Sequence, residues 1–354
     1  MKSRGIDVSC FIRLGCWLGF FLAALFLNFS PLTAKAATGE DKTQARLIEG
    51  ARKEGKLVWY TSIAGDRGEA IRKKFQEKYP FIQTTLYRTG DQHLINKIFA
   101  EAQAKRYLFD VVAITGIMGE TLKKKGLLAK YDSPERKFYP EGLKDPSAYW
   151  TDFFLNLTVI GYNTKLVSPK ECPKTYEELL SPRWKGKMLC DDKAFYWFAN
   201  VLKTMGEKNG LEYMKRLAEQ NIQFRTGRTL IAQLIAAGES PLGITLYNNR
   251  IEQMKMEGAS IEWQALEPVV PEIHPVGLFA HAPHPHAAML FIDFILSREC
   301  QEMIAGFFYI PSRIDVEPIV PRMKKGMKIL PFDFSIVDEY PRYVKLYRDV
   351  LMKK

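Results

Sequence analysis

The stretch Arg225-Thr226-Gly227-Arg228-Thr229 carries the most informative chemistry in this sequence of 354 residues. It stands directly before apolar residues at helical spacing. Guanidinium groups beside the free backbone N–H groups of a helix N-terminus favour a carboxylate, phosphate or phosphonate. We therefore predict that Arg225, Thr226 and Arg228 bind an anionic group of a ligand, with a solvated surface position as the ordinary alternative for either arginine.

Further polar residues follow the ends of apolar, β-prone runs. Thr61 and Ser62 offer hydroxyl and backbone N–H groups after the first run, or they only cap the next helix. Gly90 and Asp91 begin a later helix, where a small residue lets backbone donors approach an anion and where Asp91 is also an ordinary N-cap. Thr115 follows another such run, and we predict that all five residues bind ligand.

Two adjacent carboxylates follow a predicted strand at 187–190. Asp191 and Asp192 could bind an ammonium group or a metal, and a turn is an equal alternative. We include Asp191 among the predicted ligand-binding residues.

The sequence contains no recognisable catalytic arrangement. Ser-His-Asp, Cys-His and HExxH patterns are not evident, and no CxxC pair suggests a zinc site. Although His281, His284 and His286 are close together, we interpret them as turn and helix-start residues rather than metal ligands. We predict no catalytic residue and no cofactor, and leave a disulfide between Cys172 and Cys190 open because spacing does not show proximity.

The elements that must position these residues alternate between strand and helix. The predicted strands and helices follow one another at 57–61, 65–79, 81–87, 91–104 and 110–114. Such a βαβαβ unit requires right-handed crossovers and a parallel sheet covered on both faces. Because ligands of such sheets bind beyond the carboxyl ends of the strands, we expect the loops after the three strands to line a site.

A second α/β region is predicted from about 163 to 263, after a strand at 153–162. It includes the helix that starts near Thr229 and ends at Gly238, and a strand at 241–247. A later helix starts at Pro285.

The first 36 residues have the pattern of a secretory signal peptide. A basic start precedes an apolar run at 14–27 and the small residues Ala34 and Ala36 at the cleavage spacing. We predict export to the periplasm, with an uncleaved membrane anchor as the alternative.

The composition indicates a folded protein, because 47% of the residues are hydrophobic and 26% are charged. The formal net charge of +11 would suit binding to the phosphates of a nucleic acid. The basic residues are spread along the chain, however, so we predict no nucleic-acid partner.

Six short segments together resemble the extracellular solute-binding proteins of ABC importers, in the broad group that includes the periplasmic ferric-ion binders. They are 161–166 (GYNTKL), 180–186 (LSPRWKG), 234–243 (LIAAGESPLG), 282–288 (APHPHAA), 291–297 (FIDFILS) and 309–313 (YIPSR). Each segment is weak alone, but six in the expected order extend over most of the chain.

The resemblance implies the α/β fold of type 2 periplasmic binding proteins, with two lobes that close on a ligand. It implies a monomer that binds a small molecule and delivers it to the membrane permease of an ABC importer. The lobe boundaries that we predict from it are 45–152 with 266–335 for the first lobe and 153–265 for the second. The C-terminal segment 336–354 is assigned to neither lobe.

The resemblance also implies a ligand tyrosine at Tyr247, where ferric binders typically have two adjacent tyrosines. Here Asn248 follows, and it suits hydrogen bonding to an organic ligand, so we predict a small anionic or zwitterionic organic solute. Ferric iron is the alternative, with Tyr60 and Tyr247 as ligands. An exported enzyme or a ligand sensor on the same fold are alternatives of another class.

Overall fold

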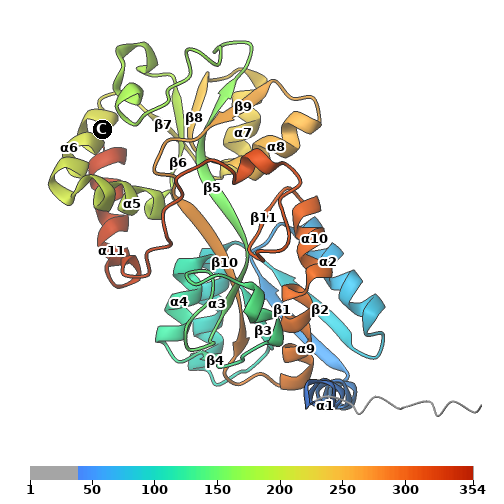
Figure 1. Ribbon diagram of the computed structural model, residues 1–354. Coiled ribbons are helices and arrows are strands. Elements are labelled where there is room, and N and C mark those ends of the chain that lie inside the picture. The colour runs from blue at the N-terminus through green and yellow to red at the C-terminus, as the bar shows by residue number, and fades with distance from the viewer. Residues whose placement is uncertain (1–38, 354) are drawn as a thin grey trace, which may run out of the picture.

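The computed structural model describes residues 39–353, so the predicted signal peptide lies outside the described residues. Within 39–353, no helix has both the length and the apolar character that a membrane crossing requires. Two groups of elements are joined by two long strands, β5 (Thr151–Asn163) and β10 (Pro271–Phe279), as Figure 1 shows.

The first group, called the first lobe, contains the predicted βαβαβ unit and the segments that return to it. Its strands are β1 (Lys56–Thr61), β2 (Gln83–Arg88), β3 (Val111–Ala113), β4 (Leu128–Ala129) and β11 (Ile310–Pro311). Its helices are α1 (Gly39–Glu54), α2 (Gly65–Lys78), α3 (Asp91–Gln103), α4 (Gly116–Lys124), α9 (Pro285–Leu296) and α10 (Arg298–Gly306). The strand predicted at 81–87 begins two residues later, at Gln83, because Phe81 and Ile82 belong to the turn before it.

The second group, called the second lobe, repeats the alternation of strand and helix. Its strands are β6 (Met188–Asp191), β7 (Gln223–Arg225), β8 (Leu242–Tyr247) and β9 (Ile261–Gln264). Its helices are α5 (Phe195–Met205), α6 (Glu207–Ala218), α7 (Arg228–Ala237) and α8 (Asn248–Met256). The C-terminal helix α11 (Ile336–Tyr347) packs against α5, and a short π-helical turn follows it (Figure 1).

One mixed sheet of eleven strands runs through the described residues in the order β2-β1-β3-β10-β5-β8-β6-β7, with β4, β9 and β11 paired at its side. β1 is parallel to β2 and β3, and β6 is parallel to β7 and β8. β5 pairs with β10 and β11 in its first half and with β8 and β9 in its second half. The carboxyl ends of both parallel groups therefore face the region between the lobes.

Alternating side chains of β1 and β3 are buried on both faces of the first lobe's sheet, which explains why these two strands are mostly apolar, whereas the edge strand β2 is largely exposed. Trp59 packs with Phe75 of α2 and Phe291 of α9 on one face. Tyr60, the next residue, packs with Leu94 of α3 on the opposite face. This coverage leaves the strand ends as the open edge of the sheet.

Candidate functional site

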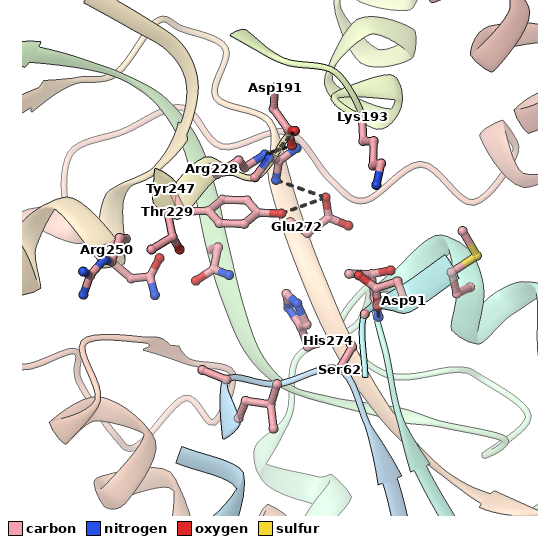
Figure 2. Close-up of a pocket in the computed structure, with 18 of the residues that line it drawn as sticks. Ser62, Asp91, Asp191, Lys193, Arg228, Thr229, Tyr247, Arg250, Glu272 and His274 are labelled. Carbon is pink, nitrogen blue, oxygen red and sulfur yellow. Dashed lines mark hydrogen bonds and ion pairs between the residues drawn. The ribbon is translucent and has the colours of Figure 1, made fainter. Parts of the chain in front are cut away.

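A cavity of about 750 Å³ lies between the two lobes at the carboxyl ends of the parallel strands (Figure 2). The loops after β1, β2 and β3 line one side of it, as the βαβαβ pattern predicts. The loops after β6, β7 and β8 line the other side, and β5 and β10 form its floor with Asn156, Glu272 and His274.

The structure brings seven of the predicted ligand-binding residues to this cavity. They are Ser62, Gly90, Asp91, Thr115, Asp191, Arg228 and Tyr247. Asp91 and Thr115 come from neighbouring loops and are tied together, because the Thr115 backbone N–H donates to Asp91 Oδ1 at 3.3 Å. Whether these residues bind ligand stays a prediction.

Two predicted residues lie beneath the cavity wall instead. Thr61 is fully buried, and its hydroxyl oxygen accepts a hydrogen bond from the Ile63 backbone N–H. Asn248 is also fully buried, where its Oδ1 accepts from the Leu157 N–H and its Nδ2 donates to the Met323 carbonyl oxygen. Both side chains hold loops in place and do not line the cavity.

Arg225 and Thr226 are exposed and lie outside the cavity lining. The prediction that these two residues bind the ligand together with Arg228 is therefore wrong, and only Arg228 lines the cavity. Arg225 closes the edge strand β7, and its guanidinium donates to the Phe224 carbonyl oxygen at 2.9 Å. Thr226 donates its hydroxyl to Asp192 Oδ2 at 2.6 Å. The physical reason is the edge position of β7, which turns these side chains toward solvent.

Arg228 lies at the centre of a cluster on the second-lobe side, which Figure 2 shows. Its Nε is 3.4 Å from Asp191 Oδ2 and its Nη1 is 3.9 Å from Glu272 Oε2. Its guanidinium carbon lies 4.1 Å from the ring centroid of Tyr247, whose hydroxyl donates to Glu272 Oε2 at 3.5 Å. The positive charge of Arg228 is therefore already paired with the Asp191 carboxylate, and with that of Glu272 once Glu272 ionises.

Glu272 and His274 are functional candidates that the sequence analysis missed. Burial raises the pKa of Glu272 to about 7, since the attraction of Arg228 offsets only part of the desolvation. Burial likewise lowers the pKa of His274 to about 3, and the nearby charge of Arg228 adds to this effect. The available signal was an acid and a histidine two residues apart in an otherwise apolar strand, a spacing that directs both to one face.

Unpartnered polar atoms are concentrated at this cavity. The described residues contain ten buried side-chain nitrogen or oxygen atoms without a hydrogen-bond partner. Six of the ten belong to residues that line the cavity: Ser62, Asn156, Arg228, Asn249, Arg250 and His274. Because a buried polar atom without a partner is costly, the cavity is built to receive a polar molecule.

Six helices begin at the cavity wall. Residues at or beside the starts of α2, α3, α4, α5, α7 and α8 line it, and none of these six helices has a side-chain hydrogen bond at its N-cap. The positive ends of six helix dipoles therefore lie at the cavity wall, which favours a negatively charged occupant.

The arrangement predicted for ferric iron is not assembled. The ring of Tyr60 stacks on Phe109 at 4.5 Å, and its hydroxyl donates to Glu101 outside the cavity. Tyr247 thus lines the cavity without Tyr60. Within the described residues, no three His, Cys, Asp or Glu side chains are grouped so that they could hold a metal ion.

The clustered histidines of the sequence separate in space. His281 stacks on Tyr107, whereas His284 Nδ1 lies 3.1 Å from Asp110 Oδ2 and His286 Nδ1 lies 2.7 Å from Glu54 Oε1. These contacts support their interpretation as turn and helix-start residues.

The cysteines of the described chain carry free thiols. Cys172 and Cys190 are both buried and unbridged, and Cys190 Sγ lies 3.3 Å from the Tyr347 hydroxyl. The disulfide left open by the sequence is therefore not formed in this structure.

Two α/β lobes around a polar cavity at their strand ends define a ligand-binding protein that closes on a small molecule. A family model described as "Bacterial extracellular solute-binding protein" matches residues 109–339. The chain belongs to this family, and its fold is that of the type 2 periplasmic binding proteins.

A curated relative and two solved structures show the extent of the similarity. An uncharacterised protein of Haemophilus influenzae is 26% identical over 302 residues, which cover 78% of this chain and 83% of the relative. Iron-bound HitA from Pseudomonas aeruginosa has a TM-score of 0.75 at 22% identity, covering 83% of this chain and 99% of that chain. AfuA from Actinobacillus pleuropneumoniae, described with exogenous fructose-6-phosphate bound, has a TM-score of 0.75 at 24% identity. The match covers 85% of this chain and 99% of AfuA.

The protein is thus the solute-binding component of an ABC importer. Proteins of this family are extracellular or periplasmic, bind small ligands and deliver them to membrane permeases. They are transport proteins.

Proposed function

We propose that this protein captures a small anionic or zwitterionic organic solute in the cavity between its lobes. The volume of about 750 Å³ is the observation that carries this proposal, since it suits an organic molecule and greatly exceeds the size of a bare metal ion. The six uncapped helix starts support a negative charge on the solute.

The charged side chains of the lining support a solute with groups of both signs. Five basic residues line the cavity, Arg67, Arg88, Lys193, Arg228 and Arg250. Four acidic residues also line it, Asp66, Asp91, Asp191 and Glu272. An acidic group of the solute would bind the guanidinium groups, and an ammonium or hydroxyl group would bind a carboxylate such as Asp91.

Ferric iron is the second candidate, because HitA, a structural neighbour, is described as iron-bound. Four tyrosines line the cavity here, Tyr196, Tyr247, Tyr309 and Tyr340. Burial raises the pKa of Tyr196, Tyr309 and Tyr340, which disfavours the phenolate form that Fe³⁺ requires. This supports the organic solute over iron.

A thermal-shift screen of the purified protein tests this proposal. The panel contains organic acids, phosphonates, phosphate monoesters, polyamines and Fe³⁺. A ligand at 100 times its dissociation constant adds about 2.7 kcal/mol to the free energy of unfolding. Stabilisation by an organic anion is expected, whereas stabilisation by Fe³⁺ alone, with the visible colour of an iron–phenolate complex, would show that the proposal is wrong.

The further parts of the function are proposals of the same kind. We propose that residues 1–36 direct export to the periplasm, and that the protein acts there as a monomer with a cognate permease, without catalysis and without binding nucleic acid. We also propose the lobe boundaries at residues 153 and 265. The contacts of Tyr347 with Asp191 and Phe195 support adding the C-terminal segment to the second lobe.

A further inference from the structure

Two guanidinium groups meet at the cavity without an acidic partner. Arg67 is the third residue of α2 in the first lobe, and its Nη2 donates to Gln253 Oε1 at 2.8 Å. Arg250 is the third residue of α8 in the second lobe, and its Nη1 donates to the same oxygen at 2.9 Å. Neither arginine forms an ion pair with an acidic residue of the described chain, whereas Arg228 forms two.

This pair is electrostatically incomplete. Only 8% of the Arg67 surface is exposed, and Arg250 Nε is buried without a hydrogen-bond acceptor. The shared Gln253 amide oxygen is neutral, and so is the Tyr309 ring that lies 4.3 Å from the Arg67 guanidinium carbon, so neither group neutralises the two positive charges. Buried charges in proteins are normally paired with an opposite charge, so the buried Arg67 and the half-buried Arg250 favour an anion that the described residues do not supply.

The surroundings match an oxyanion. Both arginines belong to the first turn of a helix, so two helix dipoles reinforce the positive potential. The Ser62 hydroxyl also lines the cavity and has no hydrogen-bond partner. Two guanidinium groups can each offer paired N–H donors, which fit the oxygens of a carboxylate or a phosphate-type group.

We propose that Arg67 and Arg250 together bind the oxyanion group of the solute, a carboxylate, phosphate or phosphonate. This proposal rests on the proposed function of the cavity as a site for an organic anion. The oxyanion replaces the amide of Gln253 between the two arginines. Because α2 and α8 belong to different lobes, the same group links the lobes and favours the closed state.

The role of Arg228 follows by contrast. An anion that bound Arg228 would also lie close to Asp191 and Glu272, whose carboxylates already interact with that guanidinium. Like charges in one site repel. The cluster around Arg228 is therefore suited to the uncharged or cationic part of the solute, and not to its oxyanion.

Simple anions can test the subsite before the solute is known. The purified protein is titrated with inorganic phosphate, acetate and methylphosphonate at constant ionic strength, with chloride as the reference anion, and binding is followed by the melting temperature. We expect saturable stabilisation by at least one of the three probes. In Arg67→Gln and Arg250→Gln, the dissociation constant for that probe rises by about 30-fold or more, as for loss of one partner of a buried charged pair.

Two matched variants separate anion binding from other effects. Arg225→Gln removes an exposed arginine outside the cavity and should leave the dissociation constant unchanged. Gln253→Ala removes the amide oxygen but no charge, and should retain binding within about threefold, because the anion displaces that amide. Arg67→Lys and Arg250→Lys keep the charge without the paired donors, so they give an intermediate loss and a second measurement if a glutamine variant fails to fold.

Three results would overturn the proposal. The first is a wild-type protein that shows no saturable response to any of the three probes. The second is equal affinity in wild type and both glutamine variants. The third is a loss in Gln253→Ala as large as in Arg250→Gln, which would identify the contact as a structural link between the lobes.

The screen of organic solutes distinguishes this failure from failure of the proposed function. An organic anion whose binding depends on Arg228 but not on Arg67 or Arg250 would refute the subsite and leave the proposed function intact. Stabilisation by Fe³⁺ alone would contradict the proposed function itself.

Discussion

The substitution Glu272→Gln should stabilise the ligand-free protein at alkaline pH. Glu272 lies on β10 at the floor of the cavity, and burial raises the pKa of its carboxyl group to about 7 from an ordinary value of 4.5. Arg228 opposes this shift and Asp91 adds to it, so both interactions are already included in the value of about 7.

The sign of the effect follows from proton linkage. Between pH 4.5 and 7 the folded protein keeps a proton on Glu272 that the unfolded chain releases, so the free energy of unfolding falls as the pH rises through this range. Above pH 7 the ionised carboxylate of Glu272 lowers the free energy of unfolding by its full amount, which for this shift in pKa is about 3 kcal/mol. Glutamine has nearly the same shape and cannot ionise, so the variant avoids this cost.

Urea denaturation of both proteins at pH 4.5, 6 and 8 measures the difference. We expect Glu272→Gln to exceed wild type by up to about 3 kcal/mol at pH 8, by less at pH 6 and by almost nothing at pH 4.5. A glutamine variant that is no more stable than wild type at pH 8 would refute the argument that the buried carboxylate is destabilising.

Glu262 provides a control of opposite sign. Burial raises the pKa of Glu262, but hydrogen bonds from Arg322 and Lys255 outweigh burial, and the net pKa is lowered. Its ionised form therefore stabilises the fold above the ordinary carboxyl pKa, and this contribution is lost as the pH falls. Glu262→Gln should accordingly destabilise the protein at pH 8, and the difference should shrink in acid.

Three further substitutions have defined outcomes. His274→Gln should shift the midpoint of acid unfolding, followed by circular dichroism, to lower pH. The pKa of His274 is lowered to about 3, so below about pH 6.5 the unfolded chain takes up a proton that the folded protein does not, and stability is lost. Glutamine cannot take up this proton. Gly116→Ala, at the start of α4, should cost about 1–3 kcal/mol in urea denaturation, since a Cβ there would lie 2.5 Å from Ile273 and Phe332. Gly65→Ala, at the start of α2, meets no atom within 4 Å and should not destabilise the protein, so an equal loss in both variants would contradict the packing argument.

The βαβαβ unit of the first lobe and parts of the second lobe could be predicted from the sequence because their elements have local signals. Pro80 stops the predicted helix that becomes α2, and Gly238 ends α7 in the left-handed conformation. The short edge strand β7 was not predicted as a separate element, since its three residues, two exposed and one half-buried, leave no hydrophobic pattern.

The site was only partly accessible. Loops after predicted parallel strands could be assigned to one edge of the sheet, and this reasoning located Ser62, Asp91 and Thr115 at the cavity. The same reasoning could not separate Thr61 from Ser62, because adjacent residues at a strand end point to opposite sides of the backbone and only the fold decides which side is open.

Residues within long elements were missed for a different reason. Glu272 and His274 lie inside β10, and Arg67 and Gln253 lie inside helices rather than in loops. Spacing places such residues on one face of an element, but it does not say whether that face is turned to solvent, to the core or to the second lobe. The contact between Arg67 and Gln253 joins residues 186 positions apart, so no local pattern could predict it.

The choice among arginines shows what a sequence motif leaves undecided. The stretch around Arg228 was a reasonable prediction for an anion site, because it combines guanidinium groups with a helix start. What decides between arginines is the charge already beside each one. Arg228 has Asp191 and Glu272 within 4 Å, so an added anion would compete with existing pairs, whereas Arg67 and Arg250 share only an amide oxygen. An anion therefore gains most where charge is uncompensated, and the count of arginines near a helix start is a weaker guide than the acids that lie against them.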